Sequence, residues 1–412
     1  MPSKPNLLVL CVDCLREDCL ASDASDTPFL DDLRTSGLAC EQLFATATTT
    51  TPAVASLLTG SYSERNGVHS LQYGRLSEEV PTLPKILGEG GWHTEALVTG
   101  PLVAETGLDR GFDVYRHRTE DESLFGDWSA TARDRLASLP EPFAAFVHCW
   151  ELHEDVDVPA AYDEPACGDT DYARALSALD RELRALVAAV PKNTLVVVHG
   201  DHGESITHRH NPLRLLAKSV RDALRYYGGV DTRSVVDRLN RALDGLGPDV
   251  DDHFLENGHG ENVYDFAANV PFVLAGPGVD PATITAQTRQ VDVLPTLLAA
   301  LGVDFEGGID GESLLPVEGV TDRPAYLRAC GASLHRRRNW ARAIRHDGAK
   351  YVEYPDRAWS AECYDLAADP QELAPIEADR LAARLERRLP ADELGDAERL
   401  DIDDRLHDLG YR

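Results

Sequence analysis

Residues 194–204 read TLVVVHGDHGE, and this stretch decides the fold. Its four aliphatic residues, 195–198, follow one another without a polar residue between them. That indicates a strand buried on both faces, as in a parallel sheet. Asp201 and His202 come directly after this strand. Because α/β proteins bind ligands beyond the carboxyl ends of their strands, the stretch predicts both a central strand and a functional site at its end.

Strand and helix patterns alternate along much of the remaining chain. The apolar runs predict further strands, at residues 6–12, 93–98, 142–148 and 270–275. Helices are expected between the strands, at residues 27–36, 52–58, 80–89, 171–190 and 290–301. This alternation predicts an α/β fold, a doubly wound and mostly parallel sheet with helices on both faces.

The pattern changes near residue 320 and divides the chain into two expected parts. Residues 1–320 form the expected catalytic domain, and residues 321–412 form a small C-terminal antiparallel hairpin with a helical tail. The hairpin is expected at Asp347-Gly348, because Asp-Gly between two strand patterns is a strong turn signal. Residues 206–252 form a helical insertion between two candidate motifs, which is either a lid over the site or a surface decoration.

The composition indicates an acidic cytoplasmic protein. The 412 residues carry a formal net charge of −30, and only five of the 40 basic residues are lysines. This resembles the cytoplasmic proteins of extreme halophiles, in which salt screens the repulsion between surface charges. The charge argues against nucleic acid as a partner. The first apolar run ends at Asp13 and is too short for a signal peptide, and no segment predicts a membrane span, so we expect eight free thiols in the cytoplasm.

A second stretch, residues 46–60, reads TATTTTPAVASLLTG and places four consecutive threonines before a helix. One hydroxyl is enough to cap a helix, and Thr51 before Pro52 fits that role. The N–H groups at a helix start also attract anions, so the surplus hydroxyls admit a second interpretation, an anion site with a threonine nucleophile. These residues alone leave both interpretations open.

Acidic and imidazole side chains follow two of the expected strands. Asp13 comes directly after the first strand, as Asp201 and His202 do after the strand quoted above. Such donors suit Mn²⁺, Zn²⁺ or Mg²⁺, and an ion held there would bind and activate a threonine hydroxyl. The alternative is that each is a helix cap or a turn residue. Cys11 and Cys14 form one C-x-x-C pair without a second pair, which does not predict a structural zinc site.

Several stretches, taken together and in order, resemble the sulfatase branch of the alkaline phosphatase superfamily. They are NLLVLCVDCLRED (6–18), TPFLDDLRTSGLACEQLFA (27–45), TTPAVASLLTG (50–60), HGDHGES (199–205), GHGENVYDFAANVPFVLAGPG (258–278), VDVLPTLLAALGV (291–303), and AIRHDGAKYVEYP (343–355) with CYDLAADPQE (363–372). The resemblance implies a metal-dependent hydrolase of an anionic ester.

The resemblance also assigns roles to particular residues. It implies that Asp13, Asp201 and His202 are metal ligands together with Thr50, which is the nucleophile, and that the next residue, Thr51, is the helix cap. The expected cofactor is a divalent metal ion (Mn²⁺, Zn²⁺, Mg²⁺ or Ca²⁺), with one site favoured over two.

Two histidines complete the expected site. His153 and His259 are similar to family histidines that contact the substrate or protonate the leaving group. An imidazole titrates near pH 6.5, so either could protonate a departing alkoxide. The alternative for each is an ordinary surface or core histidine.

The chain departs from the sulfatase pattern at three positions. Thr50 stands where sulfatases have the Cys or Ser that becomes formylglycine, Val54 replaces an arginine, and Cys14 replaces a frequent aspartate ligand. Threonine cannot yield that aldehyde, because its β-carbon carries a methyl group. A threonine nucleophile is instead similar to that of the phosphodiesterases and phosphoglycerol transferases of the superfamily. We therefore expect a hydrolase or transferase of phosphate esters, diesters above all.

Two alternatives stay open. One is a sulfuric ester hydrolase that uses unmodified Thr50. The other is a pseudo-enzyme that binds an anionic glycan or lipid headgroup without turnover. In each case the partner is an anionic ester, such as one on a glycan or a lipid headgroup, and the sequence leaves the oligomeric state open.

Overall fold

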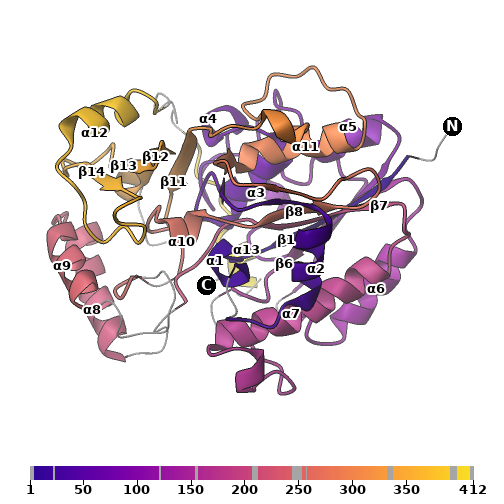
Figure 1. Ribbon diagram of the computed structural model, residues 1–412, viewed down its shortest axis with the longest axis horizontal. Helices are drawn as coiled ribbons and strands as arrows, with labels where there is room; N and C mark the ends of the chain where they lie inside the picture. Colours follow the sequence, from indigo (N-terminus) through magenta and orange to yellow (C-terminus); the bar gives the residue numbers. More distant parts are fainter. Residues whose placement is uncertain are drawn as a thin grey trace.

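The computed structural model describes residues 4–21, 24–119, 122–153, 156–206, 212–243, 253–256, 258–331, 337–389 and 397–408. An eight-stranded sheet with the order β5-β4-β6-β1-β7-β8-β2-β9 crosses the larger part of the molecule (Figure 1). Its strands are β1 (Asn6–Val12), β2 (Leu38–Cys40), β4 (His93–Val98), β5 (Val114–His117), β6 (Phe143–Cys149), β7 (Thr194–Gly200), β8 (Phe272–Ala275) and β9 (Ala282–Ile284). Two short strands, β3 (Leu43–Phe44) and β10 (Thr288–Arg289), pair separately.

The centre of the sheet is parallel, as the buried apolar runs predict. β1 pairs in parallel with β6 and β7, and β4 pairs in parallel with β5 and β6. β8 reverses this direction, because it runs antiparallel to both β7 and β2. Ser205 follows β7 and Gly258 precedes β8. Ser205 N donates to Gly258 O at 3.0 Å, so the chain comes back to the end of the sheet at which β7 finishes. It therefore re-enters the sheet in the opposite direction, and the mostly parallel sheet is confirmed with this one reversal.

Helices cover both faces of the sheet, which confirms the doubly wound arrangement (Figure 1). One face carries α3 (Thr50–Thr59), α5 (Leu83–Glu89) and α11 (Val293–Ala300). The other face carries α2 (Pro28–Ser36), α6 (Trp128–Ala137) and α7 (Asp171–Ala188).

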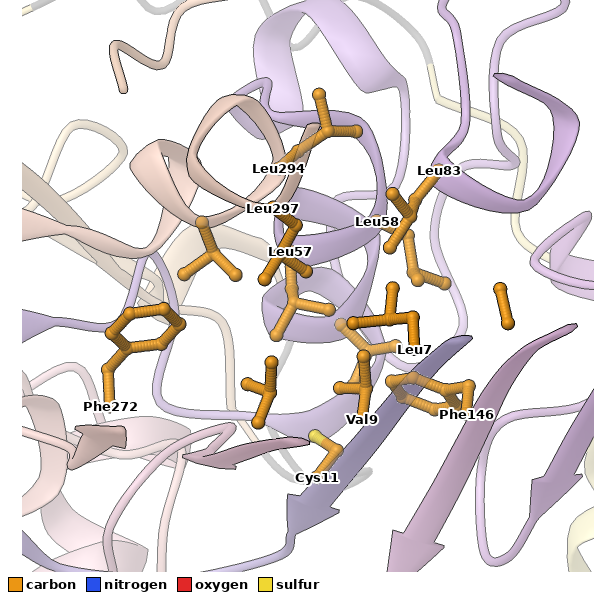
Figure 2. Close-up of a cluster of buried hydrophobic side chains, with 14 of the residues drawn as sticks. Leu7, Val9, Cys11, Leu57, Leu58, Leu83, Phe146, Phe272, Leu294 and Leu297 are labelled. Carbon is orange, nitrogen blue, oxygen red and sulfur yellow. The ribbon is translucent and has the colours of Figure 1, made fainter. Parts of the chain in front are cut away.

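Strand β1 shows why its sequence has no polar alternation. Leu7, Val9 and Cys11 pack under the leucines of α3 and α11 in one core (Figure 2). The intervening residues Leu8 and Leu10 belong to the core on the opposite face. Both faces of the strand are therefore buried, which is why residues 7–12 are all apolar.

The C-terminal part forms the separate antiparallel sheet that the sequence predicts. It has four strands in sequence order, β11 (Ala325–Ala329), β12 (Ala341–His346), β13 (Ala349–Glu353) and β14 (Glu362–Asp365). The hairpin turn lies at Asp347 and Gly348, whose φ angles are 52° and 70°. Two positive φ values in succession are the reason why Asp-Gly suits this turn. The shorter helices are α1 (Glu17–Leu20), α4 (Ser63–Asn66), α10 (Asp265–Ala268), α12 (Asp379–Glu386) and α13 (Asp403–Asp408).

The helical insertion lies beside the four-stranded sheet (Figure 1). It comprises α8 (Pro212–Asp222), a π-helical turn (Ala223–Tyr227) and α9 (Arg233–Leu243). Arg225 donates to the Tyr354 hydroxyl at 2.8 Å, and Arg233 lies 2.8 Å from the Glu362 carboxylate. Residues 207–211 and 244–252 of the expected insertion lie outside the described residues.

Helix α3 starts two residues earlier than the sequence predicts. Thr49 occupies the N-cap, with φ −145° and ψ 145°, and Thr50 is the first helical residue. The expectation that Thr51 caps this helix is therefore wrong. Thr49 does not cap through its side chain either, because its hydroxyl lies 2.8 Å from the Cys330 sulfur.

Two further expectations concern thiols and membranes. All eight cysteines lie in the described ranges, and none of them forms a disulfide. Within those ranges, no helix combines the length and the apolar character needed to cross a bilayer.

Candidate active site

The candidate site forms where β1, β6 and β7 end. Val12 and Gly200 are paired in the parallel register of β1 and β7, so Asp13 and Asp201, which follow them, lie side by side. Asp201 N donates to Val12 O at 3.3 Å, and Asp13 N donates to Cys149 O at 2.8 Å. Both carboxylates are buried. The strand ends therefore bring together two acidic groups that lie far apart in sequence.

His202 connects these carboxylates to the threonine-rich helix. Its Nε2 atom lies 3.5 Å from Asp13 Oδ1, 3.6 Å from Asp201 Oδ2 and 3.1 Å from Thr50 Oγ1. The structure thus brings together all four residues that the sequence proposes as ligands and nucleophile. The next residue, Gly203, packs closely against the backbone of residues 266–267, because a Cβ atom at that position would lie 2.2 Å from Phe266 O.

His148, at the end of β6, joins this group, although the sequence reasoning missed it. Thr99 Oγ1 lies 2.6 Å from its Nδ1 atom and fixes the ring. The Nε2 atom faces Asp13 and Asp201, at 3.9 and 3.8 Å from their Oδ2 atoms. The signal was present in the sequence, because His148 stands at a strand end as Asp13 and Asp201 do, but it continues an apolar run.

Two buried atoms in this group lack the hydrogen bonds that burial demands. Among the described residues, neither His148 Nε2 nor Asp201 Oδ2 has a hydrogen-bond partner. Buried polar atoms are almost always satisfied by protein, water or an ion. The nitrogen and oxygen donors of Asp13, His148 and Asp201 all lie within 4.8 Å of one another, so these residues fit a divalent cation.

A second ligand group lies against the first. Cys14, His202 and His259 also place one donor atom each within 4.8 Å of one another. Cys14 Sγ lies 3.9 Å from His259 Nδ1 and donates to Asp13 Oδ1 at 3.1 Å. Burial and the nearby Asp13 carboxylate raise the pKa of the Cys14 thiol in the metal-free protein.

His259 and His153, the two histidines that the resemblance singled out, lie next to each other. The His259 ring centroid is 4.4 Å from that of His202 and 5.1 Å from that of His153. Burial alone would lower the pKa of His259, but Glu204, whose Oε1 lies 3.7 Å away, raises it above the ordinary value. Glu204 is the second residue of the site that the sequence reasoning missed, and it too belongs to the stretch that decides the fold.

The pKa shifts distinguish the metal-ligand candidates Asp201 and His202 from His259. Burial opposes ionisation of Asp201, but His202 and His148 together lower its pKa to about 2. Burial lowers the pKa of His202, which favours the neutral, ligating form of the ring. His259 is the imidazole in this pocket that favours its protonated form.

Arg16, two residues after Cys14, holds neighbouring residues in place. Its buried guanidinium donates to the Asp18 carboxylate and to Glu204 O at 2.9 Å. It therefore fixes the Glu204 backbone and is not free to bind an anion.

The fold and the site define an α/β protein with a candidate metal-binding pocket at the ends of its central parallel strands. The model of the Sulfatase family matches residues 5–303, and the chain belongs to that family.

Curated relatives are sulfatases of longer chains. A choline-sulfatase of Rhizobium meliloti (strain 1021) is 33% identical over 126 residues, which cover 29% of this chain and 22% of the relative. The ulvan-active sulfatase of Formosa agariphila is 23% identical over 359 residues, which cover 76% of this chain and 65% of the relative. The chain thus spans less than two thirds of the length of these relatives.

Solved structures show the same fold. The phosphonate monoester hydrolase of Agrobacterium radiobacter superposes with a TM-score of 0.68 at 19% identity, covering 93% of this chain and 94% of that one. A 2-O GAG sulfatase superposes with a TM-score of 0.66 at 17% identity, covering 93% and 90%.

Proposed function

We propose that the protein is a metal-dependent hydrolase or transferase of phosphate esters, most of all diesters, with Thr50 as the nucleophile. The observation that carries the proposal is the position of Thr50 Oγ1, at the first residue of α3 and 3.1 Å from His202 Nε2. Residues 1–320 are the proposed catalytic domain, and a divalent ion held by Asp13, Asp201 and His202 would supply Lewis-acid activation of the hydroxyl and neutralise charge.

The protein groups around Thr50 support an in-line displacement. Free N–H groups at the start of α3 and the helix dipole favour an anionic ester at this position. Thr50 Oγ1 loses its proton to solvent and forms a bond to phosphorus while the bond from phosphorus to the leaving oxygen breaks. His153 or the adjacent His259, whose pKa Glu204 raises, donates the proton that the leaving oxygen needs. Water or an acceptor hydroxyl then takes the phosphoryl group and regenerates Thr50.

The identity of the nucleophile favours phosphate over sulfate. A formylglycine hydrate can expel bound sulfate by elimination, whereas a threonine sulfate has no such route and must wait for attack at sulfur. A phosphothreonine is released by attack at phosphorus, the reverse of its formation. A sulfuric ester hydrolase remains the second candidate, because the family model and the curated relatives are those of sulfatases. An anionic glycan or lipid headgroup is the proposed carrier of the ester, in a cytoplasmic setting that the cysteines without disulfides support.

Initial rates on a matched aryl sulfate, aryl phosphate monoester and aryl phosphate diester, at high salt with Mn²⁺ or Zn²⁺, test this proposal. We expect turnover of the phosphate esters, and we expect Thr50→Ala to lower it by several orders of magnitude, as the loss of a covalent nucleophile does. Thr51→Ala is the matched control, since Thr51 is buried beside Thr50 and its hydroxyl makes no hydrogen bond to any residue that the structure describes. Turnover of the sulfate alone would support the second candidate, and no turnover of any ester would support a pseudo-enzyme.

A further inference from the structure

Cys14 adopts a backbone conformation that few residues with a side chain adopt. Its φ is 62°, in the left-handed region, and the chain holds it there from both sides. Cys14 N donates to Asp201 Oδ1 at 3.3 Å, and the Tyr172 hydroxyl donates to Cys14 O at 2.7 Å. Unfavourable backbone conformations of this kind persist where the surrounding structure imposes them, and they cluster at functional sites.

This conformation places the Cys14 sulfur between two imidazoles and a carboxylate. Sγ lies 3.9 Å from His259 Nδ1, and one donor atom each from Cys14, His202 and His259 falls within 4.8 Å of the others. A tetrahedral zinc ion with bonds of about 2.3 Å to sulfur and about 2.0 Å to nitrogen would hold such atoms roughly 3.5 Å apart. The Cys14 and His259 atoms therefore need to close by about 0.4 Å, and the other pairs of donor atoms by about 1.3 Å at most.

We infer that Cys14, His202 and His259 form a thiolate-containing ion site that takes an ion of the zinc class, next to the oxygen-rich group of Asp13, His148 and Asp201. The inference rests on the proposed function, since both use the pocket that contains Thr50, and it changes that function in two respects. His202 Nε2 binds one ion only, so His148 takes its place beside Asp13 and Asp201 in the oxygen-rich group. A His259 ring that binds an ion leaves the adjacent His153 as the donor of the proton. A thiolate and two imidazoles select Zn²⁺ and similar ions, whereas Mg²⁺ and Ca²⁺ prefer oxygen ligands.

The other cysteines near the site differ from Cys14 in their surroundings. Cys11 lies in the core on one face of the sheet, and Cys149 lies in the core on the other face, which also includes Cys14. In the part of the chain that the structure describes, Cys14 is the one cysteine that joins a group of three candidate ligands. Its sulfur is thus set apart by its neighbours as well as by its backbone.

Cobalt(II) spectroscopy on the full chain, freed of metal with a chelator, tests the inference. We expect stoichiometric Co²⁺ to produce a thiolate-to-cobalt charge-transfer band in the near ultraviolet and intense visible bands from a tetrahedral ion. Cys14→Ser should abolish the charge-transfer band and weaken Zn²⁺ binding by at least about tenfold. Cys14→Asp should abolish the band too and shift the preference from Zn²⁺ toward Mg²⁺ or Mn²⁺.

Cys330→Ser is the matched control, because Cys330 is buried and contacts Thr49 beside the nucleophile but belongs to neither ligand group. It should keep the band. Circular dichroism and thermal unfolding show whether each variant is folded. The wild-type cobalt spectrum tests the inference even if a variant does not fold. A wild-type protein without the band, or a folded Cys14→Ser protein that retains it, would overturn the inference. Turnover of phosphate esters without the band would contradict the ion site and support the proposed function. A band without turnover of any ester would support the ion site and contradict the proposed function.

Discussion

Four consecutive threonines, residues 48–51, have four different environments, and these environments decide what each hydroxyl can do. Thr48 Oγ1 donates to Asn262 O at 2.8 Å, and Thr49 Oγ1 lies 2.8 Å from the Cys330 sulfur. Thr50 Oγ1 faces His202, and Thr51 is buried without a hydrogen bond for its hydroxyl. Three of the hydroxyls thus have different partners, and none of these partners lies near in sequence.

His148 carries a specific prediction at this scale. Its Nε2 atom has no hydrogen bond and points toward two carboxylates, while Thr99 holds the opposite side of the ring. We expect His148→Gln to weaken binding of a divalent ion at least about tenfold, measured by competition with a chromogenic chelator. His199→Gln is the control, because His199 is buried on β7, on the other side of β1 from His148, and lies outside both ligand groups. Equal affinities for wild type and His148→Gln would exclude His148 as a ligand.

The limits of sequence reasoning at the residue scale have a physical cause. Asp13 and Asp201 could be found, because a carboxylate directly after a buried strand has few explanations besides a site. His148 ends a strand in the same way, but a histidine continuing an apolar run also suits the core. The Thr51 cap was wrong because the capping preference of one threonine is worth about 1 kcal/mol, and tertiary contacts of its neighbours override it.

At the scale of elements, the helical insertion braces the loop that carries His259. Lys218 Nζ lies 2.8 Å from the Glu261 carboxylate. Arg221 lies 2.7 Å from the Glu256 carboxylate and 3.1 Å from that of Glu261. Two helical turns of α8 are thereby tied to the residues on both sides of His259. The insertion therefore has a structural connection to the site, whichever of the two sequence interpretations applies.

Loosening this brace should impair catalysis more than folding. We expect Lys218→Met to lower kcat by up to about 100-fold, because small displacements of a catalytic group can be that costly. The melting temperature should change little, since Lys218 lies on an insertion outside the sheet core. Arg238→Met on the exposed side of α9 is the matched control and should leave kcat unchanged. An unchanged kcat for Lys218→Met would mean that the His259 loop holds its position without α8.

The elements themselves were the most predictable level of the structure. β1, β4 and the central part of β7 follow the predicted ranges, because continuous apolar runs allow little besides buried strands. The reversal of β8 was not predictable from its own residues. It depends on the chain returning to the edge of the sheet that it left after β7, which the Ser205–Gly258 contact sets and no local pattern reveals.

At the scale of the whole molecule, the charged groups are of two kinds, buried ion pairs and exposed carboxylates. Some ion pairs are buried, such as Arg118 with Glu151 at 2.7 Å, and water and salt reach them poorly. Most of the acidic excess lies outside such pairs, in a chain with a formal net charge of −30. The buried pairs keep their interaction at any ionic strength, whereas the repulsion between exposed carboxylates depends on it.

This separation predicts that salt stabilises the folded protein. Raising KCl from 0.1 to 1 M shortens the Debye length from about 10 to about 3 Å, which screens the surface repulsion and spares the buried pairs. A gain of a few kcal/mol would raise the melting temperature by roughly 3–5 °C, measured by differential scanning calorimetry with and without KCl. Sucrose, which acts on exposed surface area without screening charge, is the control that separates the two effects. A melting temperature that is flat or falls with KCl while it rises with sucrose would show that surface repulsion does not limit the stability of this fold.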